Sequence, residues 1–354
     1  MPFFGGPWSV PELLADHTTL RLGGPAARWV RATTEDTLVE AVGTADAAGE
    51  PVLVLAGGSN LVVADAGFPG TVVEVATRGV NPDVQAPRDG QSSCGGVMVT
   101  VAAGENWDDL VRLAVDKEWA GIEALSGIPG SVGATPIQNV GAYGQEVSQT
   151  IASVRVWDRT LRGVRTFANA DCGFGYRTSR FKADPGRHVV LSVTFQFRQG
   201  SVGGPVAYAE LARTLGVELG ERATIADVRR SVLALRTGKG MVLDPADHDT
   251  WSAGSFFTNP VVPADAVPDG APAWPQRDGT VKSSAAWLIE RSGFAKGYGN
   301  DRVALSGKHT LALTNRGGAT TTDLLALARE VRDGVEARFG IRLVNEPVLV
   351  GCSL

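Results

Sequence analysis

Apolar and polar residues alternate along the chain in a pattern that switches repeatedly between helical and strand spacing. Between Thr34, a residue type that caps helices, and Gly49, apolar residues recur at helical spacing and predict a helix. Residues 52–56 and 71–76 are short apolar runs bounded by turn-forming residues, which is typical of strands. The start of the chain therefore predicts a small βαβ-like unit.

A second unit is expected after residues 81–96, which are polar and turn-forming and predict a linker or an inserted hairpin loop. Residues 97–103 alternate as a strand, and Asn106 can cap the helix that follows. Two further stretches, 151–157 and 189–197, also show strand alternation. This mixture predicts an α+β unit.

One more helix is expected in the second unit, and residues 239–339 predict a third unit. Thr224 begins a helix with a Thr-x-x-Asp cap, and the last turn of that helix carries Arg236 and Lys239. The elements expected beyond it are a proline-rich looped insertion at 260–275, a helix at 285–292, a strand at 310–314, an amphipathic helix at 323–339 closed by Gly340, and a final strand at 346–351.

Length and composition agree with a globular protein of two or three domains. The chain has 354 residues, more than a single hydrophobic core usually serves. Hydrophobic residues make up 44% and charged residues 20%, which argues against extensive disorder. The net charge of −5 gives no general attraction to nucleic acid or to an anionic membrane surface.

Cysteine usage and hydropathy indicate the cellular compartment. Cys94, Cys172 and Cys352 lie far apart without a Cys-x-x-Cys pair, which argues against a zinc site and a disulfide framework. The N-terminal residues lack a signal-peptide pattern, and no run of about eighteen apolar residues follows. We therefore expect a cytoplasmic protein with no metal site and no membrane segment.

The most unusual stretch runs from residue 121 to 144 and reads GIEALSGIPGSVGATPIQNVGAYG. Gly127, Gly130 and Gly133 recur at every third position, and glycine lets main-chain N–H groups approach an anion closely. The spacing matches neither the Gly-x-Gly-x-x-Gly dinucleotide turn nor the P-loop. A long glycine-rich surface loop has the same pattern, so both interpretations stay open for this stretch alone.

A second glycine-rich turn favours the ligand-binding interpretation. The apolar run 52–56 leads directly into Gly57-Gly58-Ser59-Asn60-Leu61, which is rich in main-chain donors and small polar side chains. Two such loops can hold one diphosphate between them.

The order of AGGSNLVV and then SGIPGSVGATPIQNVGAYG resembles the flavin-binding core of the UDP-N-acetylenolpyruvoylglucosamine reductase family, and the resemblance extends from about Leu20 to Gly351. It implies an α+β fold in which a two-subdomain FAD-binding module of the PCMH, or vanillyl-alcohol-oxidase-like, type is joined by a separate α/β substrate-binding domain. The implied domains are 1–80 with 340–354, 81–238 and 239–339. The residues implied to bind FAD are Gly57, Gly58, Ser59, Asn60, Leu61, Gly127, Ile128, Pro129, Gly130, Ser131, Gly133, Ala134, Ile137, Gln138, Asn139, Gly141 and Tyr143.

The resemblance also implies three catalytic residues. Arg177 in Tyr-Arg-Thr-Ser-Arg-Phe-Lys would bind the substrate carboxylate, Ser255 in Gly-Ser-Phe-Phe would protonate the substrate, and Glu346 would complete the set. Taken alone, these residues are also typical of a solvated basic turn, a turn-forming serine and a solvated glutamate. The chain departs from the family pattern at Thr258, where a lysine is common.

Further residues are implied to contact the substrate, and each has a structural alternative. Tyr208 resembles a tyrosine on a mobile loop but is equally typical of an amphipathic helix. Arg236 and Lys239 match a basic pair for the substrate, yet cations at a helix C-terminus are common. Asn259 and His309 complete the group, and a histidine at a strand edge is often without function.

The activity that the resemblance implies is a reduction of UDP-N-acetylglucosamine enolpyruvate to UDP-N-acetylmuramate by NADPH through FAD. This is the UDP-N-acetylmuramate dehydrogenase step of cytoplasmic peptidoglycan precursor synthesis. The implied partners are the enolpyruvyl nucleotide sugar and NADPH, without nucleic acid or membrane, and a monomer is expected. The alternatives are a flavin-dependent oxidase of the same fold and a non-catalytic nucleotide-sugar binding protein.

Overall fold

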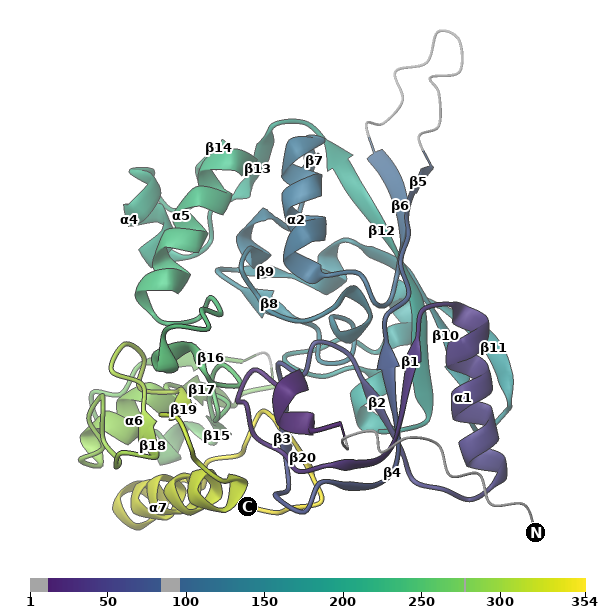
Figure 1. The fold of residues 1–354 in the computed structure, drawn as a ribbon. Coiled ribbons are helices and arrows are strands. Elements are labelled where there is room, and N and C mark those ends of the chain that lie inside the picture. The colour runs from purple at the N-terminus through teal and green to yellow at the C-terminus, as the bar shows by residue number, and fades with distance from the viewer. Residues whose placement is uncertain (1–11, 84–95, 277) are drawn as a thin grey trace, which may run out of the picture. The chain divides into compact units, whose positions relative to one another are not determined.

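The computed structural model describes residues 12–83, 96–276 and 278–354 (Figure 1). Contacts between Cα atoms divide the chain into two compact units, the first made of residues 1–29, 60–72 and 251–354 and the second of residues 30–59 and 73–250. The division into three domains stays a prediction. Cys94 and most of the expected linker at 81–96 lie outside the described residues.

The second unit is built on an antiparallel sheet with the strand order β11-β10-β12-β6-β5 and with β7 beside β12. Alternate side chains of β6 and β12 are buried, as the period of two in the sequence predicts. Val193 of β12 lies opposite Val101 of β6 and Val154 of β10, so three valines share one core. These strands are β5 (Val80–Asp83), β6 (Gly96–Ala102), β7 (Trp119–Ala120), β10 (Ile151–Asp158), β11 (Gly163–Ala168) and β12 (His188–Gln199).

Three helices of the second unit begin at the predicted caps. The side-chain oxygens of Thr34, Asn106 and Thr224 each accept the N–H three residues further on, at 3.1 to 3.2 Å. The helices that follow are α1 (Glu35–Ala47), α2 (Trp107–Asp116) and α5 (Ile225–Gly238). Trp107 of α2 is fully buried, and its indole N–H donates to the carbonyl of Leu125 at 3.0 Å, which fastens the start of α2 to the glycine-rich stretch.

Smaller elements complete this unit. A sheet of order β1-β4-β2 contains β1 (Ala26–Ala32) and β4 (Phe68–Val75), which the division into units cuts, and β2 (Val52–Leu55). The others are the pair β8 (Gly141–Ala142) and β9 (Gln145–Glu146), the pair β13 (Val202–Pro205) and β14 (Arg222–Thr224), and the helices α3 (Arg180–Ala183) and α4 (Ala209–Leu215).

The first unit has its own core around α6 (Ala285–Arg291) and α7 (Thr321–Phe339). Thr320 caps α7 by accepting the Asp323 N–H at 3.1 Å, and Gly340, with φ of +68°, ends it. The final strand β20 (Val348–Val350) pairs in parallel with β3 (Leu61–Val63), while the implied domain of 1–80 with 340–354 stays a prediction. The remaining strands are β15 (Val261–Val262), β16 (Ala273–Pro275), β17 (Val281–Ser283), β18 (Val303–Leu305) and β19 (Leu313–Asn315).

Two expectations for the first unit need correction. The insertion at 260–275 is not wholly looped, because β15 and β16 flank β17 in a three-stranded sheet. The strand expected at 310–314 lies at Leu313–Asn315 and pairs with β18, which the sequence did not predict. Strands of two or three residues are too short to show a period of two. Within the described residues, no helix is long and apolar enough to span a bilayer.

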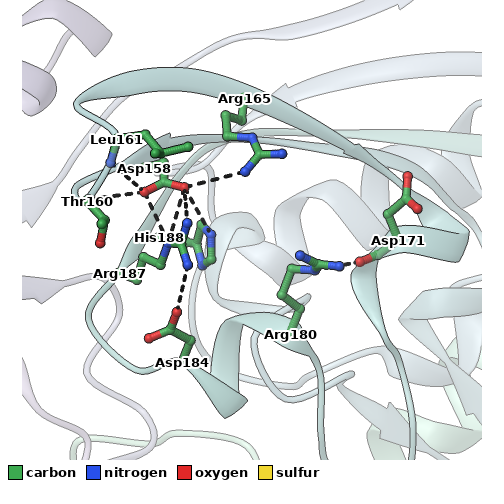
Figure 2. Close-up of polar contacts among 9 residues, drawn as sticks. All are labelled: Asp158, Thr160, Leu161, Arg165, Asp171, Arg180, Asp184, Arg187 and His188. Carbon is green, nitrogen blue, oxygen red and sulfur yellow. Dashed lines mark hydrogen bonds and ion pairs between the residues drawn. The ribbon is translucent and has the colours of Figure 1, made fainter.

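A buried carboxylate closes the β10–β11 hairpin (Figure 2). Asp158, at the end of β10, is 0% exposed and accepts the N–H groups of Thr160 and Leu161 at 3.1 and 3.0 Å. Arg187 donates to both oxygens of Asp158 at 3.0 to 3.2 Å. Because of this pairing, the pKa of Asp158 is lowered to about 2, although burial opposes the shift. The carboxylate therefore holds both the hairpin turn and the start of β12.

His188, the next residue, is buried beside this carboxylate. Its Nε2 lies 3.7 Å from Asp158 Oδ2, and within the described part of the chain its buried Nδ1 has no hydrogen-bond partner. The ring packs edge-on against Phe167 and Phe181, with centroids 5.4 and 5.7 Å away. Burial lowers the pKa of His188 more than Asp158 raises it, so the neutral imidazole is favoured in the folded chain.

We expect the free energy of unfolding to decrease as the pH falls through the window set by these two groups. The unfolded chain takes up a proton on His188 near its ordinary pKa of 6.5 and on Asp158 near 3.8, whereas both folded pKa values are lower. The unfolded state therefore binds more protons, and stability is lost with acid. Asp158→Asn should cost about 1.5 to 3 kcal/mol at pH 7 and remove the part of the loss below about pH 4, as measured by urea unfolding.

Asp184→Asn is the matched control for that measurement. Asp184 also pairs with Arg187, at 3.3 Å, but its side chain is 52% exposed. Its loss should cost less than about 1 kcal/mol. Equal costs for the two variants would contradict the special role of the buried carboxylate.

Candidate active site

The two glycine-rich loops lie directly against each other in the second unit. A Cβ on Gly57 would stand 2.6 Å from the Cα of Gly130, so only glycine permits this approach. The Ser59 hydroxyl donates to the Pro129 carbonyl at 3.1 Å and links the same two loops. The expectation that these distant segments form one clamp is therefore confirmed as geometry, while their contact with FAD stays a prediction.

The second loop is held in place by its main chain. The Gly130 carbonyl accepts the Trp107 N–H at 3.1 Å, and the Gly133 N–H donates to the Ala103 carbonyl at 2.8 Å. A Cβ on Gly133 would lie 2.5 Å from that of Ala103. The loop is thus fixed before any ligand arrives, which lowers the cost of ordering it around one.

One buried group in this loop fits a bound polar ligand. Ser131 is 5% exposed, and its hydroxyl has no hydrogen-bond partner among the residues that the structure describes. Buried polar groups are almost always satisfied, so an unsatisfied hydroxyl within a glycine-rich loop suits a phosphate or ribityl oxygen. Among the described residues, no group of three His, Cys, Asp or Glu side chains is placed to hold a metal ion.

Asp108, which the sequence reasoning missed, controls the start of the loop. Its Oδ1 accepts the N–H of Gly127 at 2.6 Å and both its oxygens accept from Arg229 at 2.7 and 2.8 Å. Burial raises the pKa of Asp108, but these hydrogen bonds outweigh burial and lower it. Because the Gly127 N–H serves Asp108, we expect Gly127 to shape the loop through its φ of +70°.

Four of the predicted ligand residues, Tyr143, Tyr208, Arg236 and Lys239, lie near one another. Tyr143 meets Tyr208 edge-on with ring centroids 5.4 Å apart, and Lys239 Nζ lies 5.7 Å from the centroid of the Tyr143 ring. Arg236 donates to the Met241 carbonyl at 2.8 Å, while none of the described residues forms a hydrogen bond with its buried Nε. Burial raises the pKa of Tyr143 and lowers that of Arg236. Partly buried cations beside two phenols are suited to an anionic ligand.

Tyr208 and Lys239 have a neighbour that the sequence did not point out. Glu210, in the first turn of α4, accepts from Lys239 Nζ at 2.5 Å. Tyr208 stands just before α4, at its N-cap, and is 45% exposed. Tyr208 therefore lies at the start of the helix and not within it, in contrast to the amphipathic-helix alternative.

Arg177 lies in a tight turn beside the glycine stretch. Its Nη2 donates to the Gly141 carbonyl at 2.9 Å, and its own carbonyl accepts from Lys182 Nζ at 3.0 Å. The turn is closed by mutual hydrogen bonds between Gly175 and Thr178 at 3.1 and 3.3 Å. Arg177 is thus attached to the same loop that carries the predicted flavin contacts.

Ser255 and Glu346 are brought together in the first unit. The Glu346 N–H donates to the carbonyl of Phe256 at 2.8 Å, and Phe257 forms a bridge with Asn345. Phe256 and Phe257 are both buried and anchor the turn, so partly exposed Ser255 has a fixed main chain. The two candidate catalytic residues therefore belong to adjacent segments.

The other predicted residues of the first unit lie around the same turn. The Phe256 N–H donates to the carbonyl of Leu311 at 2.7 Å. This hydrogen bond brings the segment of His309, two residues before Leu311, beside the turn. Asn60 Nδ2 donates to the Glu346 carbonyl at 3.4 Å. Asn259 accepts the first N–H of α6 at 3.0 Å, which gives it a structural task as well. Their contacts with substrate or FAD stay predictions.

The chain matches two known protein families in succession. Residues 26–163 match the FAD binding domain, and residues 244–350 match the C-terminal domain of UDP-N-acetylenolpyruvoylglucosamine reductase. A UDP-N-acetylenolpyruvoylglucosamine reductase of Cutibacterium acnes is 60% identical, covering 96% of this chain and 90% of the relative. The enzyme of that name from Streptomyces avermitilis is 56% identical, covering 96% and 94%.

A solved structure supports the same assignment. The crystal structure of UDP-N-acetylenolpyruvylglucosamine reductase from Thermus caldophilus is 26% identical, with a TM-score of 0.65, covering 96% of this chain and 98% of that one. Together with the FAD binding domain, this fold defines an FAD-binding oxidoreductase of mixed α and β structure. The chain belongs to the UDP-N-acetylenolpyruvoylglucosamine reductase family. The resemblance, the fold class and the enzyme class expected from the sequence are confirmed.

Proposed function

We propose that this protein reduces UDP-N-acetylglucosamine enolpyruvate to UDP-N-acetylmuramate with NADPH. The observation that carries this proposal is the 60% identity to a reductase of that name over nearly the whole chain. The reaction belongs to peptidoglycan precursor synthesis, and we place it in the cytoplasm and assign it to a monomer.

The paired glycine loops are the part of the chain that would hold FAD. Main-chain groups that a ligand can approach closely are supplied by Gly57 and Gly130, and hydroxyl groups by Ser59 and Ser131. The unsatisfied hydroxyl of Ser131 fits a hydrogen bond to FAD. When bound, FAD supplies the chemistry of hydride transfer from NADPH to C3 of the enolpyruvyl group. The remaining work falls to side chains of this protein.

Arg177, Glu346 and Ser255 have separate tasks in this proposal. Addition of hydride at C3 places negative charge on C2 and on the carboxylate of the substrate. The planar guanidinium of Arg177 can hold that carboxylate through two hydrogen bonds and stabilise the developing charge. Glu346, if protonated or paired with Arg177, would help to hold the same group, because two bare carboxylates repel each other. Ser255 delivers a proton to C2.

The cationic cluster of the second unit suits the diphosphate of the nucleotide sugar. Lys239 and Arg236 carry the charge, and Tyr208 can donate a hydrogen bond from its exposed phenol. In the first unit, Asn259 and His309 are assigned to contacts with the rest of the substrate. Glu210 would then give up Lys239 to the diphosphate when the substrate binds.

An anaerobic titration of the purified protein tests the activity. We expect a yellow protein whose flavin absorbance is bleached by NADPH and restored by UDP-N-acetylglucosamine enolpyruvate. Bleaching by an alcohol or amine without NADPH, with recovery in oxygen, would indicate an oxidase instead. A colourless protein after reconstitution with FAD would indicate a binding protein.

Arg177→Lys tests the carboxylate contact. Lysine keeps the charge but loses the planar fork, so turnover of the enolpyruvyl substrate should fall about 100-fold. The half-reaction with NADPH should be nearly unchanged, and stopped-flow absorbance separates the two. Arg180→Lys is the control, because Arg180 lies in the same motif but donates outward to the Asp171 carbonyl at 2.7 Å. Equal losses in both half-reactions would assign Arg177 to flavin binding or folding.

A further inference from the structure

The side-chain amide of Asn139 joins the glycine stretch to the turn that carries Arg177. Asn139 is 1% exposed, and its Nδ2 donates to the Glu146 carboxylate at 2.9 Å and to the Gly175 carbonyl at 3.0 Å. Its Oδ1 accepts the N–H of Ser148 at 3.1 Å. Both amide hydrogens are therefore used inside the protein, and one of them binds Gly175, two residues before Arg177.

The partners of Asn139 fix which way the amide faces. The main-chain N–H of Ser148 can only donate, whereas the carbonyl of Gly175 and the carboxylate of Glu146 accept. The oxygen of the amide must face Ser148, and its nitrogen must face the other two groups. A side chain of the same shape with two acceptor oxygens cannot reproduce this pattern.

Lys182 holds the same turn from its other end. Its Nζ donates to the carbonyl of Arg177 at 3.0 Å. Between these two attachments, the Ser179 hydroxyl donates to the Ile137 carbonyl at 2.5 Å, which again joins the turn to the glycine stretch. The segment around Arg177 is therefore fastened before, at and after the arginine.

The main chain of Arg177 explains why such fastening is needed. Its φ is +52°, a conformation that residues other than glycine rarely adopt. A conformation of this kind persists only where the surrounding structure enforces it. Without the hydrogen bonds to Gly175 and to the Arg177 carbonyl, the turn could relax and carry the guanidinium away from its position beside Gly141.

We infer that Asn139 and Lys182 are positioning residues that hold Arg177 in the orientation used on the substrate. This inference rests on the proposed role of Arg177. It also gives the side chain of Asn139 a task that differs from the flavin contact expected from the sequence. Neither residue needs to touch the substrate, because each acts through the main chain on either side of the arginine.

Asn139→Asp in the FAD-loaded, full-length protein tests the inference. The change keeps the shape and the tolerance of positive φ but replaces the two donors by acceptors. We expect the half-reaction with the enolpyruvyl substrate to slow about 10-fold to 100-fold, since misplacement of a catalytic group by about 1 Å has effects of this size. FAD content and the half-reaction with NADPH should stay within about twofold of the wild-type values.

Two further measurements separate positioning from general damage. Asn169→Asp is the matched control, because the Asn169 amide donates to the carbonyls of Ser148 and Ile151 at 2.8 Å each without touching the Arg177 turn. It should leave both half-reactions near the wild-type rates. In the Arg177→Lys background, Asn139→Asp should add little further loss, since the two changes act through one group.

The outcomes distinguish this inference from the proposed function. If Arg177→Lys leaves the substrate half-reaction unchanged, the proposed role of Arg177 fails. If Arg177→Lys is damaging but Asn139→Asp slows neither half-reaction, or multiplies fully with Arg177→Lys, the positioning inference fails. Should Asn139→Asp not fold, Lys182→Met carries the test. It removes the bond to the Arg177 carbonyl at the other end of the turn, and an unaltered substrate half-reaction there would overturn the inference.

Discussion

The Gly57→Val variant is expected to lose FAD while its fold survives. A Cβ at this position would stand 2.6 Å from the Cα of Gly130, a main-chain atom that has no rotamer with which to move aside. The two loops must separate to admit the side chain, and overpacking of this kind costs about 1 to 3 kcal/mol. If the FAD-bound state is destabilised by that amount, the affinity for FAD should decrease by up to about 100-fold.

Flavin absorbance after reconstitution measures this effect, and urea unfolding of the apoprotein measures the fold. Gly204→Val is the matched control in the same unit, because its Cβ would meet no atom within 4 Å and its main chain lies in a strand, β13. The control should bind FAD as the wild type does. Full flavin content in a well-folded Gly57→Val protein would show that the paired loops are not the FAD site.

The parts of the fold that could be predicted from the sequence are those encoded locally. The helix caps are examples, since each cap needs only a side-chain oxygen and the main-chain N–H three residues further on. This holds for Thr34, Asn106 and Thr224. The burial alternation of β6 and β12 is likewise written in neighbouring residues. Gly58, Gly127 and Gly130 could be recognised in the same way, since their positive φ angles favour glycine.

What could not be predicted depends on residues that are distant in sequence. Asp108 reads as an ordinary acidic residue in the first turn of a helix, and only the fold brings Arg229 to it. The attachment of Lys239 to Glu210 spans two helices in the same way. The hydrogen bond from the Asn139 amide to the Gly175 carbonyl likewise joins residues far apart in sequence, while the flavin contact of Asn139 stays a prediction.

The candidate active site shows both what the sequence could predict and what it could not. Arg177, Ser255 and Glu346 were found through motifs, and no spacing in the sequence relates one to another. The structure adds the local reason for each position: Ser255 precedes two buried phenylalanines, and Glu346 donates its N–H to one of them. Chemistry at these positions is therefore best tested one half-reaction at a time.

Ser255→Ala is expected to slow the half-reaction with the enolpyruvyl substrate by about 10²- to 10⁴-fold, or roughly 3 to 5 kcal/mol of barrier. The physical reason is that hydride addition at C3 leaves C2 in need of a proton, and the proposed donor is this hydroxyl. The half-reaction with NADPH needs no proton at C2 and should be spared. Because Ser255 is partly exposed and its turn is anchored by Phe256 and Phe257, the loss of one oxygen should leave the fold intact.

Ser252→Ala provides the matched control within the same turn. The Ser252 hydroxyl accepts the N–H of Gly254 at 3.3 Å, so this variant loosens the turn without removing the proposed proton donor. A neutral hydrogen bond of this kind is worth about 1 kcal/mol, which corresponds to an effect of roughly fivefold if all of it reached the reaction. Equal slowing by Ser252→Ala and Ser255→Ala would therefore assign the effect to the shape of the turn.

Ser255→Cys then separates acidity from position. An ordinary hydroxyl is a poor acid, and it can act here only because C2 becomes strongly basic after hydride addition. A thiol has a pKa of about 8.5 and nearly the same shape, so it should recover part of the rate that alanine loses if proton donation is the task of this residue. Stopped-flow absorbance of both half-reactions in the wild type, Ser255→Ala and Ser255→Cys decides the matter. A normal substrate half-reaction in Ser255→Ala would remove Ser255 from the mechanism, and slowing of the NADPH half-reaction to the same extent would assign Ser255 to flavin binding.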